Sequence, residues 1–354
     1  DYFNNGEKIK NAIAAAEDIL AKTEATTEEI MQARDALDEA IKDIGSYSLK
    51  DVYADKFYIG AAVHLNGLGD EKYTQNLLSQ YNSITVENDM KPEVLLDQAA
   101  SKAAGAVKCD FTKMDQYCDF AVEHGLKMRG HTFVWHSQTP SWFFKEGFDD
   151  NGAYVDASTM DIRLQQFIDE VFEHIKEKYP GLFYAYDICN EVVSSMSLES
   201  SHWKNVYGDY SFVTKAFELA RKASEGTGIK LYYNDYNEYD PGKAEQIIEL
   251  LADAKAAGNV DGIGMQSHVN IYYPSIDQYR ETIDKFVAAG YDVQITELDI
   301  ATAINGNGPA PDAAMAAKQA QIYKELFQCY IDYKDKISSV TLWGINDQHS
   351  WRGS

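Results

Sequence analysis

The chain is organised around the stretch Tyr184–Val193, which reads YAYDICNEVV. Its first half is mostly apolar, as expected of a buried strand, and it ends abruptly at Glu191. The stretch Tyr291–Ile300, YDVQITELDI, repeats this pattern and carries Glu297. A glutamate at the end of a buried strand is costly without a role or a partner. If both strands are parallel members of one barrel, the two carboxylates face one pocket, where such a pair can act on a glycosidic bond.

From residue 51 onward, short β-rich runs alternate with amphipathic helices. Eight runs are predicted strands: Phe57–Val63, Ile84–Glu87, Lys127–Thr132, Tyr184–Asn190, Lys230–Tyr233, Gly262–Gln266, Val293–Glu297 and Val340–Trp343. The predicted helices include Cys109–His124, Asp161–Tyr179, a helix that Asp240-Pro241 opens and Gly258 closes, and Pro311–Lys334. Eight β/α units in about 300 residues predict an α/β fold, a (β/α)8 TIM barrel over residues 46–354. A doubly wound open sheet is the rival, but the sequence has no Gly-rich phosphate loop after its first strand.

Residues 1–45 form a separate predicted unit, a helical hairpin. Lys8–Lys22 and Thr26–Ile44 both have helical periodicity, and Thr26 with Glu29 forms a T-x-x-E capping box. A hairpin of this size cannot bury a core alone. It resembles the last two helices of three-helix spacer modules in secreted bacterial surface enzymes. We therefore interpret it as a spacer, with a binding role as the alternative.

The composition excludes several classes of partner. The net charge of −24 argues against nucleic acid and anionic membrane surfaces, because binding to both depends on Lys and Arg. No apolar run approaches 18 residues, so no membrane span is predicted. The chain starts at Asp1 without a signal peptide, which indicates a processed or trimmed product. The four cysteines, Cys109, Cys118, Cys189 and Cys329, lack CxxC spacing and support neither zinc nor a disulfide framework.

Polar and aromatic side chains follow nearly every predicted strand. They are Glu87, Asn88, Lys91, His131, Trp135, His136, Gln138, Asn190, Glu191, Asn234, Asp235, Gln266, His268, Glu297, Asp299, Trp343, Asn346, Asp347, His349 and Trp351. For one such residue a structural role is the simpler interpretation. Polar groups at seven consecutive strand ends instead indicate a polar ligand, because buried polar groups need partners.

Neither a metal nor a cofactor is predicted. His131, His136 and His268 could in principle form a zinc site. However, HTFVWH has strand-to-loop spacing, in which alternation directs its two His side chains differently, and it is not HExxH on a helix. The sequence also lacks a GxSxG nucleophile elbow and a phosphate cradle.

Seven stretches occur in one characteristic order: YNSITVENDMK, GHTFVWHSQTPSW, YDICNEV, YYNDYN, GIGMQSH, ITELDI and VTLWGINDQHSW. On these motifs, residues 51–351 resemble glycoside hydrolase family 10, whose dominant activity is endo-β-1,4-xylanase. The resemblance makes Glu191 the general acid/base and Glu297 the nucleophile of a retaining double displacement. The implied substrate-binding residues are Glu87, Asn88, Lys91, His131, Trp135, Gln138, Asn190, Asn234, Gln266, His268, Trp343 and Trp351. Asp187 and Asp299 are implied supporting carboxylates.

The resemblance implies xylan and xylo-oligosaccharides as partners, hydrolysed by a secreted bacterial enzyme. Three alternatives stay open. Another retaining β-glycanase, such as a cellulase, is distinguished by a substrate panel. A non-catalytic glycan-binding barrel is disfavoured because both glutamates are present. A surface attachment module predicts binding that depends on residues 1–45.

Two features depart from the family pattern. The chain stops at Ser354, before the final helix that family members usually have, and it carries the N-terminal hairpin. The expectation is a truncated chain, or a gap in the barrel's cover that the hairpin or a second chain fills. Docking of the hairpin would predict a lower Tm when residues 1–45 are deleted.

Overall fold

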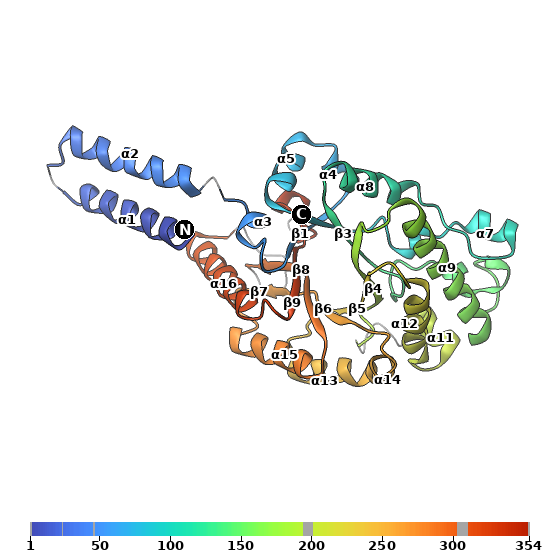
Figure 1. Ribbon diagram of the computed structural model, residues 1–354. Coiled ribbons are helices and arrows are strands. Elements are labelled where there is room, and N and C mark those ends of the chain that lie inside the picture. Colours follow the sequence, from blue (N-terminus) through green and yellow to red (C-terminus); the bar gives the residue numbers. More distant parts are fainter. Residues whose placement is uncertain (1, 23, 45–46, 194–200, 303–310, 353–354) are drawn as a thin grey trace. The chain divides into compact units, whose positions relative to one another are not determined.

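The computed structural model describes residues 2–22, 24–44, 47–193, 201–302 and 311–352, which divide into two compact units. The first unit, Asp1–Asp55, contains α1 (Tyr2–Leu20), α2 (Thr27–Ile44) and the short α3 (Leu49–Val52), with α1 packed against α2 (Figure 1). The predicted capping box is present. Glu29 donates its backbone N–H to Thr26 Oγ1 over 3.2 Å, and Thr26 N–H donates to Glu29 Oε2 over 2.9 Å. This reciprocal pair satisfies two donors that the helix start leaves unbonded.

The second unit, Lys56–Ser354, is a closed barrel of eight parallel strands. The strands are β1 (Tyr58–Val63), β2 (Ser83–Val86), β3 (Lys127–Gly130), β4 (Phe183–Asn190), β5 (Lys230–Asp235), β6 (Gly262–Met265), β8 (Asp292–Ala301) and β9 (Ile337–Leu342). Each pairs in parallel with its neighbours, and β9 closes the barrel against β1 with Val340 opposite Ile59. A TIM barrel is therefore confirmed.

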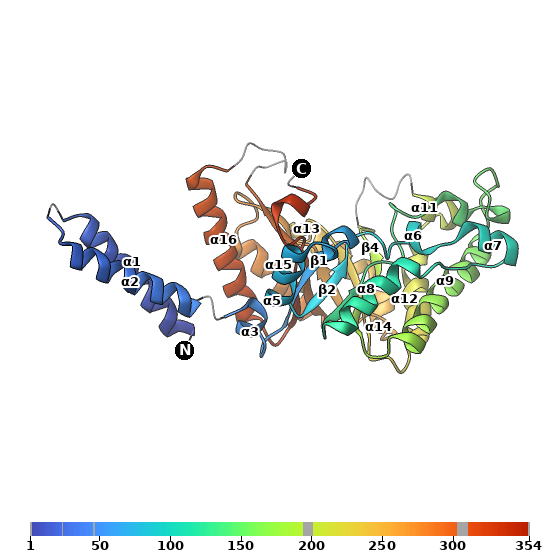
Figure 2. The same ribbon diagram turned by 90° about the horizontal axis from the view of Figure 1, so that it is seen from above.

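Helices surround the strands on the outside, as Figure 2 shows from above. They are α4 (Leu65–Leu68), α5 (Glu71–Gln80), α6 (Pro92–Leu95), α7 (Gln98–Ala104), α8 (Thr112–Glu123), α9 (Ala157–Lys178), α11 (His202–Tyr207), α12 (Ser211–Ala223), α13 (Pro241–Leu250), α14 (Ala252–Ala256), α15 (Ile276–Ala288) and α16 (Ala313–Asp332). Because the helices cover the outer face, most strand residues are buried, including polar ones such as Arg129 of β3 and Ser339 of β9. No helix among the described residues is long and apolar enough to cross a membrane.

The eight predicted strands are confirmed in position, but three local features differ from prediction. The single helix predicted from Asp240-Pro241 to Gly258 is two helices, α13 and α14, which are separated at Leu251. The strand predicted over Val293–Glu297 continues to Ala301, so Glu297 lies inside β8 rather than at its end. The extension pairs with β7 (His268–Asn270), a short strand that was not predicted. Asp240 occupies the expected position before α13, but its side chain makes no cap hydrogen bond and accepts one from the Tyr273 hydroxyl instead.

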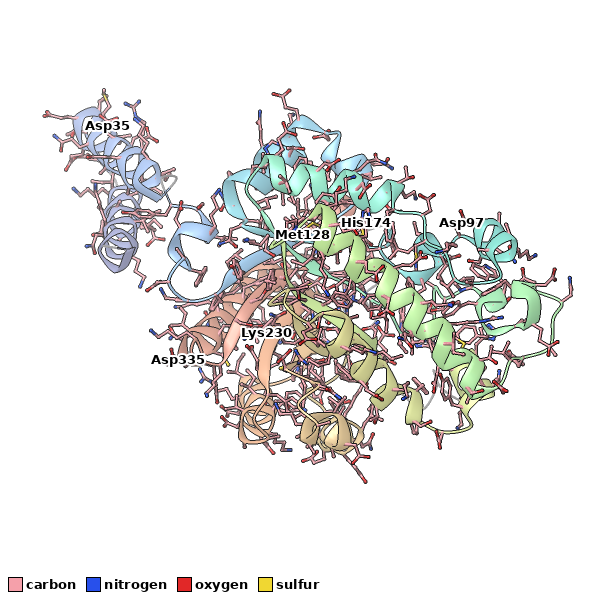
Figure 3. The ribbon with its side chains drawn as sticks, turned by 45° about the vertical axis from the view of Figure 1, so that its right-hand side comes forward. Asp35, Asp97, Met128, His174, Lys230 and Asp335 are labelled. Carbon is pink, nitrogen blue, oxygen red and sulfur yellow. The ribbon has the colours of Figure 1, made fainter. Side chains whose placement is uncertain are left out.

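The two ends of the barrel differ in character. At the end where the strands begin, Lys230 of β5 and Asp335, just before β9, are exposed (Figure 3). At the opposite end, the last residues of β4 and β5 and the middle of β8 are buried although they are polar. Buried polar groups must be bonded, so this end must contain either a polar network or a ligand site.

Candidate active site

A cavity of about 460 Å³ lies at the carboxyl ends of the barrel strands. Its lining consists of Glu87, Asn88, Lys91, His131, Trp135, Asn190, Glu191, Tyr236, Asn237, Gln266, His268, Glu297, Trp343, Trp351 and Arg352. Most of the predicted site residues are therefore brought together. Four predicted residues, Gln138, Asn234, Asp187 and Asp299, are outside this lining but bond directly to residues within it.

Glu191 is the first residue after β4 and has a left-handed backbone conformation with φ of 56°. Its backbone N–H donates to the Asn234 carbonyl of β5 over 2.9 Å. Both carboxyl oxygens accept hydrogen bonds, Oε2 from Trp135 Nε1 over 2.8 Å and Oε1 from Gln266 Nε2 over 2.9 Å. The carboxyl group is thus held at the cavity wall by two neutral donors.

Glu297 lies in β8 and is 5% exposed. Asn234 Nδ2 donates to its Oε1 over 2.8 Å, and His268 Nε2 lies 3.2 Å from its Oε2. Burial alone would raise the pKa of Glu297, but the hydrogen bond from His268 and the electrostatic influence of His131 and His268 outweigh burial. Together with the bond from Asn234 they lower the pKa to about 2, so Glu297 is ionised at neutral pH.

Amide side chains join the two glutamates. Asn190 Oδ1 accepts from Asn234 Nδ2 over 2.9 Å and from Gln266 Nε2 over 3.3 Å. In the opposite amide orientation, the Asn190 nitrogen would lie against Asn234 Nδ2 and Gln266 Nε2, which are both donors, so Oδ1 is the atom that lies between them. Gly264 of β6 leaves room for this network, because a Cβ there would lie 2.4 Å from Asn234 Oδ1.

His268 is held from its other side by Asp299. Its Nδ1 lies 2.9 Å from Asp299 Oδ2, and the same oxygen accepts a hydrogen bond from Trp351 Nε1 over 2.8 Å. Arg352 Nε forms an ion pair with Asp299 Oδ1 over 2.7 Å. Burial lowers the pKa of His268, but the bonds to Asp299 and Glu297 outweigh burial and raise it to about 10. His268 is therefore protonated at neutral pH, and Asp299 joins it to the chain's C-terminal loop.

A buried ion pair underlies the cavity on the β3 and β4 side. Arg129, 1% exposed, forms a two-pronged ion pair with Asp187, which is fully buried. Asp187 Oδ2 also bonds His131 Nδ1 over 2.9 Å. His131 therefore presents its other ring nitrogen away from Asp187, and its ring meets Trp343 edge-on with 5.9 Å between centroids. This arrangement fixes one wall of the cavity.

Lys91 supplies a positive charge opposite the glutamates. Its Nζ donates to Asn88 Oδ1 over 2.9 Å and to Gln138 Oε1 over 2.8 Å, and it lies 4.7 Å from the Trp135 ring centroid. Burial lowers the pKa of Lys91, whereas the charges of Glu297, Glu87 and Glu191 act to raise it. Gln138 thus reaches the site through Lys91 and Asn88, not through the cavity surface.

The raised pKa of His268 predicts a pH-dependent stability. In the folded chain His268 keeps its proton up to about pH 10, whereas the ordinary pKa of a histidine is 6.5. The resulting stabilisation of the fold is therefore complete below pH 6.5 and is lost as pH rises through about 10. Glu297 acts in the opposite sense, because its stabilisation is complete above 4.5 and is lost as pH falls through about 2. Between about pH 6 and about pH 9, we expect urea unfolding midpoints to fall more for the wild type than for His268→Gln. The control is His124→Gln, a change at an exposed histidine, whose midpoint should fall as much as that of the wild type. Equal falls of the midpoint in the wild type and in His268→Gln would contradict this expectation.

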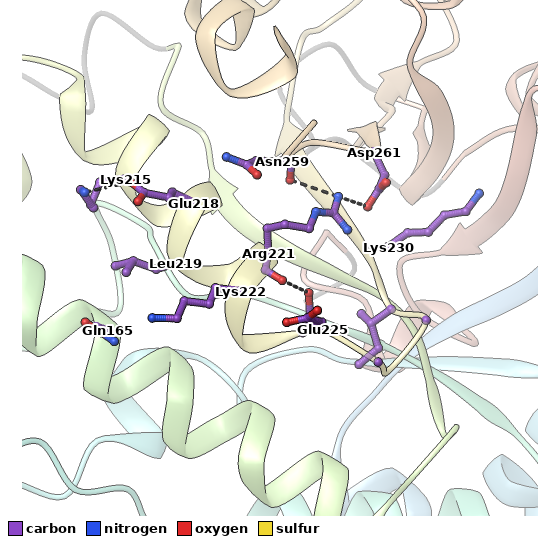
Figure 4. A pocket seen from close by; sticks show the side chains of 14 residues that line it. Gln165, Lys215, Glu218, Leu219, Arg221, Lys222, Glu225, Lys230, Asn259 and Asp261 are labelled. Atoms are coloured by element: carbon purple, nitrogen blue, oxygen red, sulfur yellow. Dashed lines mark hydrogen bonds and ion pairs between the residues drawn. The ribbon is translucent and has the colours of Figure 1, made fainter. Parts of the chain in front are cut away.

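A second hollow, of about 820 Å³, lies at the opposite end of the strands, between α9, α12 and the start of β5 (Figure 4). Its charged side chains are largely paired with each other, as Arg221 Nη2 donates to Asp261 Oδ2 over 2.6 Å and to the Asn259 carbonyl over 3.2 Å. Among the described residues, no group of three or more His, Cys, Asp or Glu side chains is arranged to hold a metal ion. The two glutamates and the amide groups that join them line the other cavity, at the carboxyl ends of the strands.

Sequence reasoning missed three lining residues, Tyr236, Asn237 and Arg352. The first two belong to the YYNDYN stretch, of which only Asn234 and Asp235 were assigned to a strand end. Arg352 directly follows Trp351, at which the matching region ends. Tyr236 and Asn237 lie inside a recognised motif, whereas Arg352 lies one residue beyond one.

Comparison with known proteins gives one consistent family. The profile of glycosyl hydrolase family 10 matches residues 48–354. The bifunctional endo-1,4-beta-xylanase XylA of Ruminococcus flavefaciens is 41% identical over 318 residues, which cover 87% of this chain and 32% of that protein. Endo-1,4-beta-xylanase Y of Acetivibrio thermocellus is 38% identical over 330 residues, which cover 86% of this chain and 30% of that protein. The chain thus spans about a third of the length of these two relatives.

Solved structures agree with the sequence comparison. The CBM22-1 and GH10 modules of the Clostridium thermocellum endo-1,4-beta-D-xylanase 10B, complexed with xylohexaose, have a TM-score of 0.79 at 37% identity and cover 86% of this chain and 63% of that one. XynB from Paenibacillus barcinonensis, complexed with a conduramine derivative, has a TM-score of 0.75 at 35% identity and covers 86% of this chain and 88% of that one.

Proposed function

Because the chain belongs to glycosyl hydrolase family 10, we propose that it is a retaining endo-β-1,4-xylanase that cleaves internal bonds of xylan. The observation that carries the proposal is the pair of carboxyl groups, Glu191 and Glu297, at one cavity. One is hydrogen-bonded by neutral groups, and the other is held ionised by His268 and Asn234. Two carboxyl groups with different environments are what an acid and a nucleophile require.

In the proposed first step, Glu297 attacks the anomeric carbon while Glu191 donates a proton to the leaving oxygen. The glycosyl ester on Glu297 then carries no negative charge. Glu191, now a carboxylate, takes a proton from a water molecule, whose oxygen attacks the same carbon and displaces Glu297, which leaves as a carboxylate. Two inversions at this carbon leave the product in its original β configuration. In retaining glycosidases, the carboxyl groups of the acid and the nucleophile lie about 5–5.5 Å apart, which leaves no room for a water molecule between the nucleophile and the sugar.

The remaining cavity residues are proposed to bind sugar. Asn190, between the two glutamates, is placed to bond the sugar 2-hydroxyl, a contact that strengthens toward the oxocarbenium-like transition state. Lys91, His131 and Trp135 would surround the sugar being cleaved, and Glu87 and Asn88 would bond hydroxyls of the next sugar toward the non-reducing end. Trp343 and Trp351 would cover the faces of these two sugars. These two indoles are also the candidates for excluding the hydroxymethyl group of glucose.

A substrate panel tests the proposal. The purified chain is incubated with unsubstituted β-1,4-xylan, mixed-linkage β-glucan and a soluble cellulose, and reducing ends and chain length are followed together. We expect xylan to be cleaved at internal bonds and the glucans to be cleaved about 10–200-fold more slowly. This is the range of discrimination that steric exclusion of one small group, here the hydroxymethyl group, provides. Faster cleavage of a glucan would replace the proposal by another β-glycanase. Binding without cleavage of any substrate would leave a glycan-binding barrel.

We also propose that the enzyme acts outside the cell, because a polymer such as xylan does not enter intact. Xylanase activity in the culture medium of the source cells checks this. Activity confined to the washed cell lysate would contradict it.

A further inference from the structure

The three peptide groups that follow β4 are all bonded to β5. Glu191 N–H donates to the Asn234 carbonyl over 2.9 Å. The next two, Val192 and Val193, donate their N–H groups to one atom, the Tyr233 hydroxyl oxygen, over 3.0 and 2.9 Å. The chain leaves the sheet at this point, so these bonds replace the strand ladder. A side chain of β5 therefore fixes the backbone directly after Glu191.

The Tyr233 hydroxyl is itself fixed by a buried carboxylate. It donates to Asp235 Oδ2 over 2.5 Å, and both side chains are completely buried. Asp235 Oδ1 accepts from Lys243 Nζ over 2.7 Å and from Tyr236 N–H over 2.9 Å. Burial, together with a smaller influence of the nearby Glu191, outweighs the opposing influence of Lys243 and Tyr233 and raises the pKa of Asp235 to about 6. The hydroxyl hydrogen therefore points to Asp235, which leaves the oxygen lone pairs for the two peptide groups.

Neither Tyr233 nor Asp235 lines the cavity. Successive side chains of a strand point to opposite faces, so both are turned away from the face that carries Asn234. They cannot touch a substrate there. Any effect on the reaction must pass through the backbone that they hold.

That backbone is in an unfavourable conformation. Glu191 has φ of 56°, a left-handed value that a residue with a Cβ rarely adopts. Such conformations persist only where the surroundings enforce them, and they cluster at functional sites. The direction of the Glu191 side chain depends on this turn, because Trp135 and Gln266 can reach its two oxygens only if the carboxyl group stands between them.

Resting on the proposed function, we propose that Tyr233 and Asp235 are positioning residues for the general acid/base, holding the turn at Glu191 so that its proton is aimed at the glycosidic oxygen. Their removal should act on proton transfer and much less on sugar binding or on attack by Glu297. This separates the proposal from a purely structural role, which would reduce all steps together.

The test compares two substrates that share a xylobiosyl group and differ in their need for an acid. The dinitrophenolate group of dinitrophenyl β-xylobioside leaves without being protonated. The phenolate group of phenyl β-xylobioside needs a proton on its oxygen in order to leave. For Tyr233→Phe we expect kcat/KM to fall by about 10–100-fold with the phenyl substrate and by less than about threefold with the dinitrophenyl substrate. The larger fall is a part of the rate enhancement that a general acid provides in total. Azide, which attacks without a general base, should raise kcat for the dinitrophenyl substrate in the variant but not in the wild type.

Two further variants complete the test. Asp235→Asn keeps the shape of the side chain but cannot accept from both Lys243 and Tyr233, so it should give the same selective loss, even if Tyr233→Phe does not fold. Tyr184→Phe is the matched control, because its hydroxyl is also bonded, to Ser83 and Ser339, but far along β4 from Glu191. It should leave the ratio of the two kcat/KM values unchanged.

Equal losses on both substrates, or none, would overturn the inference and leave the proposed function intact. A wild type that cleaves neither xylobioside would overturn both. A changed substrate ratio in Tyr184→Phe would show that any buried hydroxyl has this effect, and would also overturn the inference.

Discussion

Glu297→Gln is expected to lower kcat on xylan by a factor of at least about 10⁴, as the removal of a covalent nucleophile does in other enzymes. The glutamine has nearly the same shape, but it carries no charge with which to attack the anomeric carbon. It also removes the anion that, with Asp299, holds the proton on His268. Initial rates of reducing-end release from xylan measure the effect.

The control for this variant is Glu249→Gln, an identical chemical change at an exposed position of α13. It should retain wild-type activity. A Glu297→Gln variant that keeps more than about a tenth of the wild-type rate would remove Glu297 from the role of nucleophile.

Arg129→Met is expected to lower the free energy of unfolding by about 3–5 kcal/mol, since it leaves the fully buried Asp187 without its two-pronged cation. Urea unfolding followed by tryptophan fluorescence measures the loss. The control is Lys102→Met, which breaks an exposed ion pair with Asp149 and should leave the midpoint unchanged within error. A midpoint for Arg129→Met equal to that of the control would contradict the buried-pair interpretation.

The double variant Arg129→Met with Asp187→Leu separates stability from activity. Removing both charges should recover part of the stability that the single change loses, because no charge is left buried alone. Activity should not recover, because His131 has then lost the carboxylate that orients its ring. Recovery of both would show that Asp187 serves only to neutralise Arg129.

The architecture could be predicted from sequence because short β-rich runs alternate with helices and most of the runs end in polar residues. Asn190-Glu191 at the end of β4 and Glu297 in β8 mark the same end of the barrel, and parallel strands bring them together. The short β7 could not be predicted, because three residues carry no periodic signal, and so the extension of β8 beyond Glu297 was missed.

The side-chain contacts were less accessible from sequence than the strand positions. Asn234 and Asp235 are neighbours in one motif, yet alternation sends Asn234 to Glu297 and Asp235 to Tyr233 and Lys243. Which residue faces the site depends on the register of the barrel, which the sequence alone does not reveal. Loop residues such as Asn237, with φ of 50°, are directed by tertiary contacts that act after the strand has ended.

The central claim is that Glu297 forms a covalent glycosyl ester which Glu191 helps to resolve. The most direct measurement is proton NMR of xylohexaose during its first minutes of cleavage, before the new reducing ends mutarotate. We expect the β anomer of each new reducing end to form first, because two displacements retain configuration. The α anomer forming first would mean a single displacement by water, and would contradict the assignment of Glu297 as nucleophile.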